Sequence, residues 1–109
     1  MSVEITHDIH GMTAAVSGEI DHHAAADIRM AIDGELEHTM PQTLTFDMSG
    51  VTFMDSSGVG LVLGRARALK QWGGKVRISE PSARAEKILR LSGLGALIVG
   101  KPSGKERKK

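Results

Sequence analysis

The sequence of 109 residues contains no cysteine, which excludes disulfide bonds and thiolate chemistry and fits a reducing cytoplasm. It has only three aromatic residues, too few for a surface that stacks nucleic-acid bases. The formal net charge of +1 gives no strong field to attract DNA. No apolar run approaches the length of a transmembrane span, and the N-terminus lacks a signal-peptide pattern. We therefore expect a cytoplasmic protein that contacts neither nucleic acid nor membrane directly.

The first half of the chain changes from a strand period to a helix period. Alternating apolar residues in VEITHDIH and GMTAAVSG predict two strands, joined as a hairpin at Gly11. Asp21 then stands where an N-cap would, and Pro41 marks the end of the helix that follows. The apolar face of this predicted helix consists of Ala25, Ile28, Ile32 and Leu36.

The second half alternates strands and helices. TLTFDM predicts a strand, residues 49–55 a loop, and Ser56 or Ser57 the start of a second helix that ends at WGG. KVRIS predicts a strand, Pro81 opens a third helix that closes at Gly93, and ALIV predicts a last strand. The predicted inward faces are Val59, Val62, Ala66 and Leu69 in the second helix, and Ala85, Ile88 and Leu89 in the third.

This order, β-β-α-β-α-β-α-β, predicts an α/β fold with one mixed sheet and helices packed on it. Forty per cent of the residues are hydrophobic, enough for the core of one domain. We assign residues 1–100 to that domain and residues 101–109 to a basic tail, predicted to be disordered. Because the tail is short, a solubilising role is favoured over contact with an acidic partner or nucleic acid through Lys105, Arg107, Lys108 and Lys109.

Gly58, Gly60 and Gly64 resemble a dinucleotide-binding glycine pattern, with Glu80 at the end of the next strand as a ribose-binding acid. Such a turn follows its strand at once, whereas here the predicted loop 49–55 and two serines intervene. Close packing of a helix start against the sheet is the favoured explanation.

Two enzymatic or metal-binding alternatives find little support. Neither Ser56 nor Ser57 lies in the G-x-S-x-G pattern of a nucleophile elbow, although the spacing permits a triad with Asp21 and a histidine. His22 and His23 are adjacent, so on a helix they point about 100 degrees apart and do not share a metal. We expect no catalytic residue, no metal and no cofactor.

The segment FMDSSGVG places Asp55, Ser56 and Ser57 at a helix start. The simplest function of these residues is N-capping, in which a side-chain oxygen accepts a free backbone N–H. The same place also suits a phosphorylated serine, because the helix dipole and the free N–H groups favour an anion.

Three segments together resemble the bacterial anti-sigma factor antagonists: GEIDHHAAADIR, FDMSGVTFMDSSGVGLVLGRARALKQWGGKV and LSGLGALI. The resemblance covers residues 3–99 and is strongest to the antagonists of anti-sigma F factor. It implies a STAS domain, in agreement with the element order derived above. One departure concerns the C-terminus, where the sporulation members of the family continue into a further helix.

The resemblance implies a partner switch. Such an antagonist binds an anti-sigma factor that is also a serine kinase and thereby releases the sigma factor. The kinase phosphorylates the serine after the aspartate of the D-S-S/T-G motif, here Ser56 with Ser57 as the second candidate, and a PP2C-type phosphatase reverses this. The implied partner-binding residues are Asp21, His22, His23, Asp55, Ser56, Ser57 and Gly58.

An alternative function is a STAS module that serves as a scaffold or transport accessory, in which the serines only cap a helix. A neighbouring gene for an ATP-binding anti-sigma kinase would favour the switch, and a neighbouring transporter gene would favour the alternative.

Overall fold

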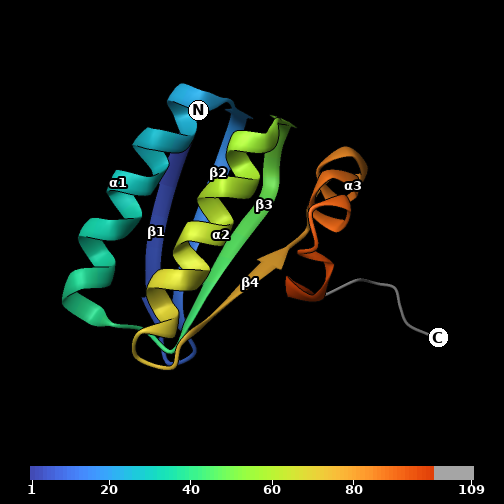
Figure 1. Cartoon of the computed structure of the whole chain (residues 1–109). Helices are drawn as coiled ribbons and strands as arrows, with labels where there is room; N and C mark the ends of the chain where they lie inside the picture. The colour runs from blue at the N-terminus through green and yellow to red at the C-terminus, as the bar shows by residue number, and fades with distance from the viewer. Residues whose placement is uncertain (100–109) are drawn as a thin grey trace.

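The computed structural model describes residues 1–99, which form a five-stranded sheet with three α-helices packed against it (Figure 1). The basic tail and Gly100 lie outside the described residues. The elements are β1 (Ser2–Asp8), β2 (Gly11–Ile20), α1 (His22–Thr39), β3 (Thr43–Met54), α2 (Ser56–Lys70), β4 (Lys75–Ser79), α3 (Ala83–Leu91), the 3-10 turn η1 (Gly95–Leu97) and β5 (Ile98–Val99).

The strands lie in the sheet in their sequence order, β1-β2-β3-β4-β5. The hairpin β1–β2 is antiparallel, and the pairs β2–β3, β3–β4 and β4–β5 are parallel. The predicted mixed sheet and element order are therefore confirmed. Because β2 and β3 are parallel neighbours, their carboxyl ends, and the starts of α1 and α2, meet at one edge of the sheet (Figure 1).

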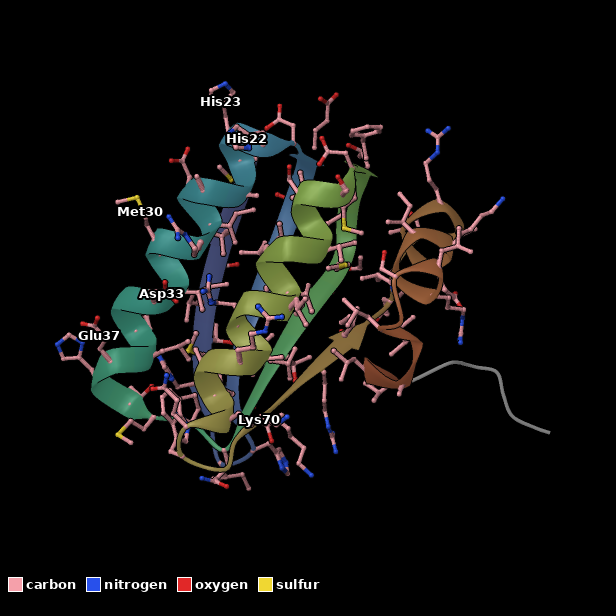
Figure 2. The ribbon with its side chains drawn as sticks, viewed as in Figure 1. His22, His23, Met30, Asp33, Glu37 and Lys70 are labelled. Atoms are coloured by element: carbon pink, nitrogen blue, oxygen red, sulfur yellow. The ribbon has the colours of Figure 1, made fainter. Side chains whose placement is uncertain are left out.

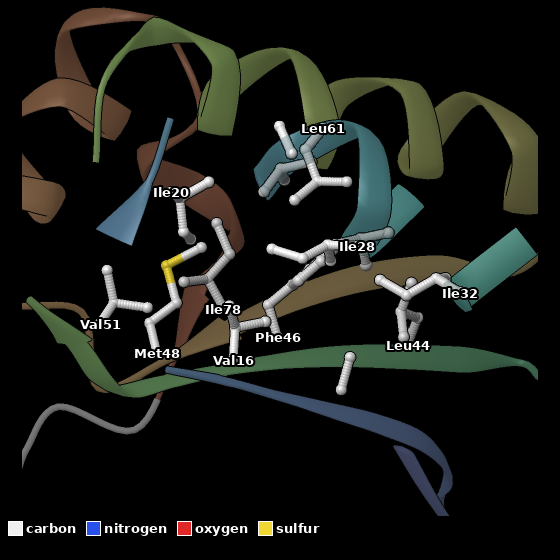
Figure 3. Close-up of a cluster of buried hydrophobic side chains, with 14 of the residues drawn as sticks. Val16, Ile20, Ile28, Ile32, Leu44, Phe46, Met48, Val51, Leu61 and Ile78 are labelled. Carbon is white, nitrogen blue, oxygen red and sulfur yellow. The ribbon is translucent and has the colours of Figure 1, made fainter. Parts of the chain in front are cut away.

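The core lies between the sheet and the helices, with Phe46, Leu44 and Met48 of β3 at its centre (Figure 3). The predicted inner face of α1 is confirmed, since all four of its residues are buried. In α2, Val62 and Leu69 are fully buried as predicted, whereas Val59 and Ala66 are only partly buried. The prediction missed two buried residues of α2, Gly58 and Leu61. This helix packs against both the sheet and α1.

The predicted loop 49–55 is wrong for all but its last residue, because β3 continues to Met54. Ser49 and Gly50 were predicted to follow the end of the strand. In the structure Gly50 pairs with Ser17, at a place where the register between β2 and β3 shifts. A methyl group on Gly50 would lie 2.9 Å from Cβ of Ser17. The glycine therefore permits close approach at an irregularity inside the strand.

Two smaller predictions are also corrected. The first strand ends at Asp8, whose carboxylate accepts the N–H of His10 at 2.7 Å, so that Ile9 lies exposed in the hairpin turn. The predicted strand ALIV begins as the turn η1, and only Ile98 and Val99 pair with β4.

Candidate functional site

Two strand-to-helix turns lie side by side at the carboxyl edge of the sheet. Ile20, the last residue of β2, pairs with Met54, the last residue of β3. The N–H of Asp55 donates to the carbonyl of Ile20 at 3.2 Å, which ties the second turn to the first. The turn at Asp21 and the turn at Asp55 therefore meet.

An aspartate caps the helix in both turns with nearly the same backbone conformation. Asp21 has φ −102° and ψ −171°, and its Oδ1 accepts the N–H of Ala24 at 2.9 Å. Asp55 has φ −104° and ψ −169°, and its Oδ1 accepts the N–H of Ser57 at 2.8 Å. The Ala24 hydrogen bond, aided by nearby His23, holds the pKa of the Asp21 carboxyl below its usual value.

The two serines differ in exposure. Ser56 is the first residue of α2 and is exposed, whereas Ser57 is partly buried. Within residues 1–99 neither hydroxyl makes a hydrogen bond, because Asp55 supplies the cap. The free hydroxyl of Ser56 therefore lies on the surface at the point where the two turns meet.

Gly58 is buried against the end of β3. A methyl group at this position would lie 2.5 Å from Sδ of Met54, closer than real Cβ contacts come. Gly58 thus allows the first turn of α2 to pack on the strand that precedes it. This supports the packing explanation for Gly58 but contradicts it for Gly60, where a methyl group would meet nothing within 4 Å. The argument from an intervening loop was also wrong, because β3 continues to Met54.

The adjacent histidines lie at the exposed start of α1 (Figure 2). Their ring centroids are 5.7 Å apart. His22 lines a groove that it shares with Ser57, and His23 lines a second hollow with Asp21 and Asp27. The pair therefore borders both sides of the capped turn.

Sequence reasoning missed two arginines in the groove between α1 and α2. The groove has a volume of about 390 Å³, and Arg29 and Arg65 line it together with His22 and Ser57. Arg65 lies four residues from each of the buried residues Leu61 and Leu69. An arginine on the buried stripe of a helix was the signal in the sequence.

In residues 1–99 no group of three or more His, Asp or Glu side chains is placed to hold a metal ion. Within the same range no hydrogen bond joins Ser56 or Ser57 to a histidine. No helix of the described residues is long and apolar enough to span a membrane. What the site offers is an exposed hydroxyl, two cap carboxylates and a cationic groove, an arrangement suited to recognition.

The model of the STAS domain family matches residues 1–106 of the chain. A relative described as an anti-sigma F factor antagonist, from Lysinibacillus sphaericus, is 44% identical over 82 residues, which cover 75% of this chain and 70% of the relative.

Solved structures show the same similarity. The unphosphorylated anti-sigma factor antagonist SpoIIAA superimposes with a TM-score of 0.82 at 33% identity, over 90% of this chain and 86% of that one. The phosphorylated form of SpoIIAA, a Bacillus cell fate determinant, gives a TM-score of 0.74 at 33% identity, over 90% and 89% of the two chains.

Proposed function

The chain belongs to the STAS domain family, as an anti-sigma factor antagonist. We propose that phosphorylation of Ser56 controls its binding to an anti-sigma factor. In this proposal the anti-sigma factor is also the serine kinase, and its capture by the antagonist releases the sigma factor. A PP2C-type phosphatase removes the phosphate and restores binding. The antagonist acts in the cytoplasm and catalyses nothing itself.

The observation that carries the assignment of Ser56 is its free, exposed hydroxyl beside an aspartate cap. A kinase must bring the attacking hydroxyl into line with the γ-phosphate of ATP, so the hydroxyl has to be reachable. Ser56 meets this condition, whereas Ser57 is partly buried and Ser82 accepts the N–H of Ala85 at 3.1 Å.

The same position tolerates the phosphate once it is attached. A phosphoserine carries about −1.5 to −2 charges at neutral pH. At the first residue of α2 the positive end of the helix dipole favours an anion. Because the cap uses Asp55, modification of Ser56 breaks no hydrogen bond of the described fold.

We propose that the phosphate weakens binding by local charge and bulk. The proposed partner-binding surface, residues 21–23 and 55–58, already carries the carboxylates of Asp21 and Asp55. An added dianion must be desolvated when the partner docks and repels any acidic group opposite it. A penalty of about 3 kcal/mol lowers affinity by more than a hundredfold, at 1.4 kcal/mol per tenfold.

Intact-mass analysis after incubation with the kinase of the same organism and ATP tests the assignment. The parent and Ser57→Ala should gain one phosphoryl group, and Ser56→Ala should bind the kinase but gain none. Ser56→Asp should bind the kinase weakly. Peptide mapping that places the phosphate on Ser57 or Ser82 would reject Ser56.

Amide spectra of the two forms test the local mechanism. Phosphorylation should shift the resonances of residues 21–23 and 54–60 and leave those of β4 and α3 in place. Shifts throughout β4 and α3 would indicate a conformational change and rule out a purely local effect.

A further inference from the structure

Two glycines of α2 have no packing role in the free protein. Glycine inside a helix is less favourable than alanine, so its presence calls for a reason. At Gly58 the reason is the contact with Met54, but a methyl group at Gly60 or Gly64 would meet nothing within 4 Å. Open space therefore lies above both positions.

That space belongs to the groove between α1 and α2. Gly60 and Gly64 line the groove from α2, and Ala25 and Ala26 line it from α1. Small residues on both helices let a segment of another protein approach closely. The groove continues to Ser57 and His22, and so adjoins the proposed partner-binding surface.

Arg65 is incompletely paired in this groove. Its side chain is only 11% exposed, and its Nε and Nη1 are buried without a hydrogen bond to any residue in 1–99. Oδ1 of Asp33 lies 3.1 Å from Nε, within ion-pair distance but without hydrogen-bond geometry. Burial lowers the pKa of Arg65, and the charge of Arg29 acts in the same direction. Two arginines therefore line the groove, and within residues 1–99 Asp33 is the one carboxylate at ion-pair distance from either of them.

We propose that this groove receives an acidic side chain of the anti-sigma factor, with Arg65 as its main contact. The planar guanidinium presents parallel N–H groups that match a carboxylate, and a buried donor without an acceptor gains most from one. Arg29 adds positive charge, and the two glycines leave room for the backbone that carries the acid. This inference rests on the proposed function.

Calorimetry of the anti-sigma factor binding to five proteins tests the proposed contact with Arg65. They are the parent, Arg65→Met, Arg67→Met, Asp33→Asn and Gly64→Leu, each also melted to establish that it folds. Arg67 is the matched control because it is exposed on another side of the same helix. Arg65→Met should lower affinity about tenfold to a hundredfold, and Arg67→Met less than about threefold.

Asp33→Asn separates recognition from a structural ion pair. It removes the partner of Arg65 within the chain but keeps the cation, so binding should be equal to that of the parent or tighter. Gly64→Leu fills the groove and should bind weakly while remaining folded. If Arg65→Met and Asp33→Asn weaken binding equally, in step with their melting temperatures, the role of Arg65 is structural and the inference is wrong.

Two further results are distinguishable from these. If the parent itself does not bind the anti-sigma factor, the proposed function fails. If the parent binds and Arg65→Met binds as tightly, only the inference fails. A titration with inorganic phosphate that saturates the shifts of Gly60, Gly64 and the Arg65 side chain would show a site for small anions, and would overturn the assignment to a partner carboxylate.

Discussion

Replacing Gly58 by alanine should destabilise the protein, whereas the same change at Gly60 should stabilise it. In a helix interior alanine is more favourable than glycine by about 0.8–1 kcal/mol. At Gly60 nothing opposes this gain, because a methyl group would meet no atom within 4 Å. At Gly58 the methyl group would lie 2.5 Å from Sδ of Met54 and nearer still to Cγ.

The cost at Gly58 depends on whether Met54 can move. Its side chain is 1% exposed and lies in the core, so it has little free space. Forcing an extra methyl group into a packed core costs about 1–3 kcal/mol. After subtraction of the helix gain, Gly58→Ala should be about 1 kcal/mol less stable than the parent, and about 2 kcal/mol less stable than Gly60→Ala.

Urea unfolding of the three proteins, followed by circular dichroism, measures these differences. The slopes should agree, so that the midpoints report stability. Truncation of Met54 in the Gly58→Ala background provides a further control, since the added methyl group should partly fill the cavity and the two costs should be less than additive. If both alanine variants are stabilised alike, Met54 yields freely and the packing explanation of Gly58 is wrong.

Three further predictions concern the core, a loop and a cap. Val62→Asp places a carboxylate at a fully buried position and should cost at least about 3 kcal/mol, and a melting temperature equal to that of the parent would refute the assigned face of α2. Trp72→Phe removes the hydrogen bond from Nε1 to the carbonyl of Pro41, 2.8 Å away, and should cost about 1–2 kcal/mol; circular dichroism must report it, because Trp72 is the only tryptophan. Asp21→Asn keeps a cap but removes the charge. Since the pKa of Asp21 is lowered in the folded state, the advantage of the parent over Asp21→Asn should be present above the unfolded value of 3.8 and vanish as the pH falls through the folded pKa. Urea midpoints of both proteins across this range measure it, and an advantage that grows in acid would contradict the sign.

The sequence correctly predicted those elements whose apolar spacing and end signals indicate the same structure. The apolar spacing of α1 and the cap at Asp21 fixed that helix correctly, because its burial and its start agree. The end of β3 was mispredicted because Ser49 and Gly50 are turn-forming residues that here lie at a register shift between two strands. Such a shift depends on the partner strand and leaves no periodic signal in the strand itself.

One part of the candidate site could be predicted from the sequence and another could not. The meeting of the turns at Asp21 and Asp55 could be predicted, since parallel neighbours bring their carboxyl ends to one edge. The groove could not, because it needs the relative placement of α1 and α2. In the sequence Arg65 is not distinguished from the other charged residues. The structure shows that its Nε and Nη1 are buried and, within residues 1–99, have no hydrogen-bond acceptor.

Because Asp55 and not a serine caps α2, the stability of this helix does not depend on the serine proposed to be phosphorylated. Helix α3 begins with a serine cap, since Oγ of Ser82 accepts the N–H of Ala85, so a phosphate on Ser82 would be attached to the oxygen that makes the cap hydrogen bond. Helix α2 instead uses the carboxylate of Asp55 and leaves the hydroxyl of Ser56 unused in the described fold. A regulated serine has to change the surface without a loss of stability in one of its two states. The aspartate directly before Ser56 meets that requirement, which gives the D-S-S-G sequence a physical reason independent of any resemblance.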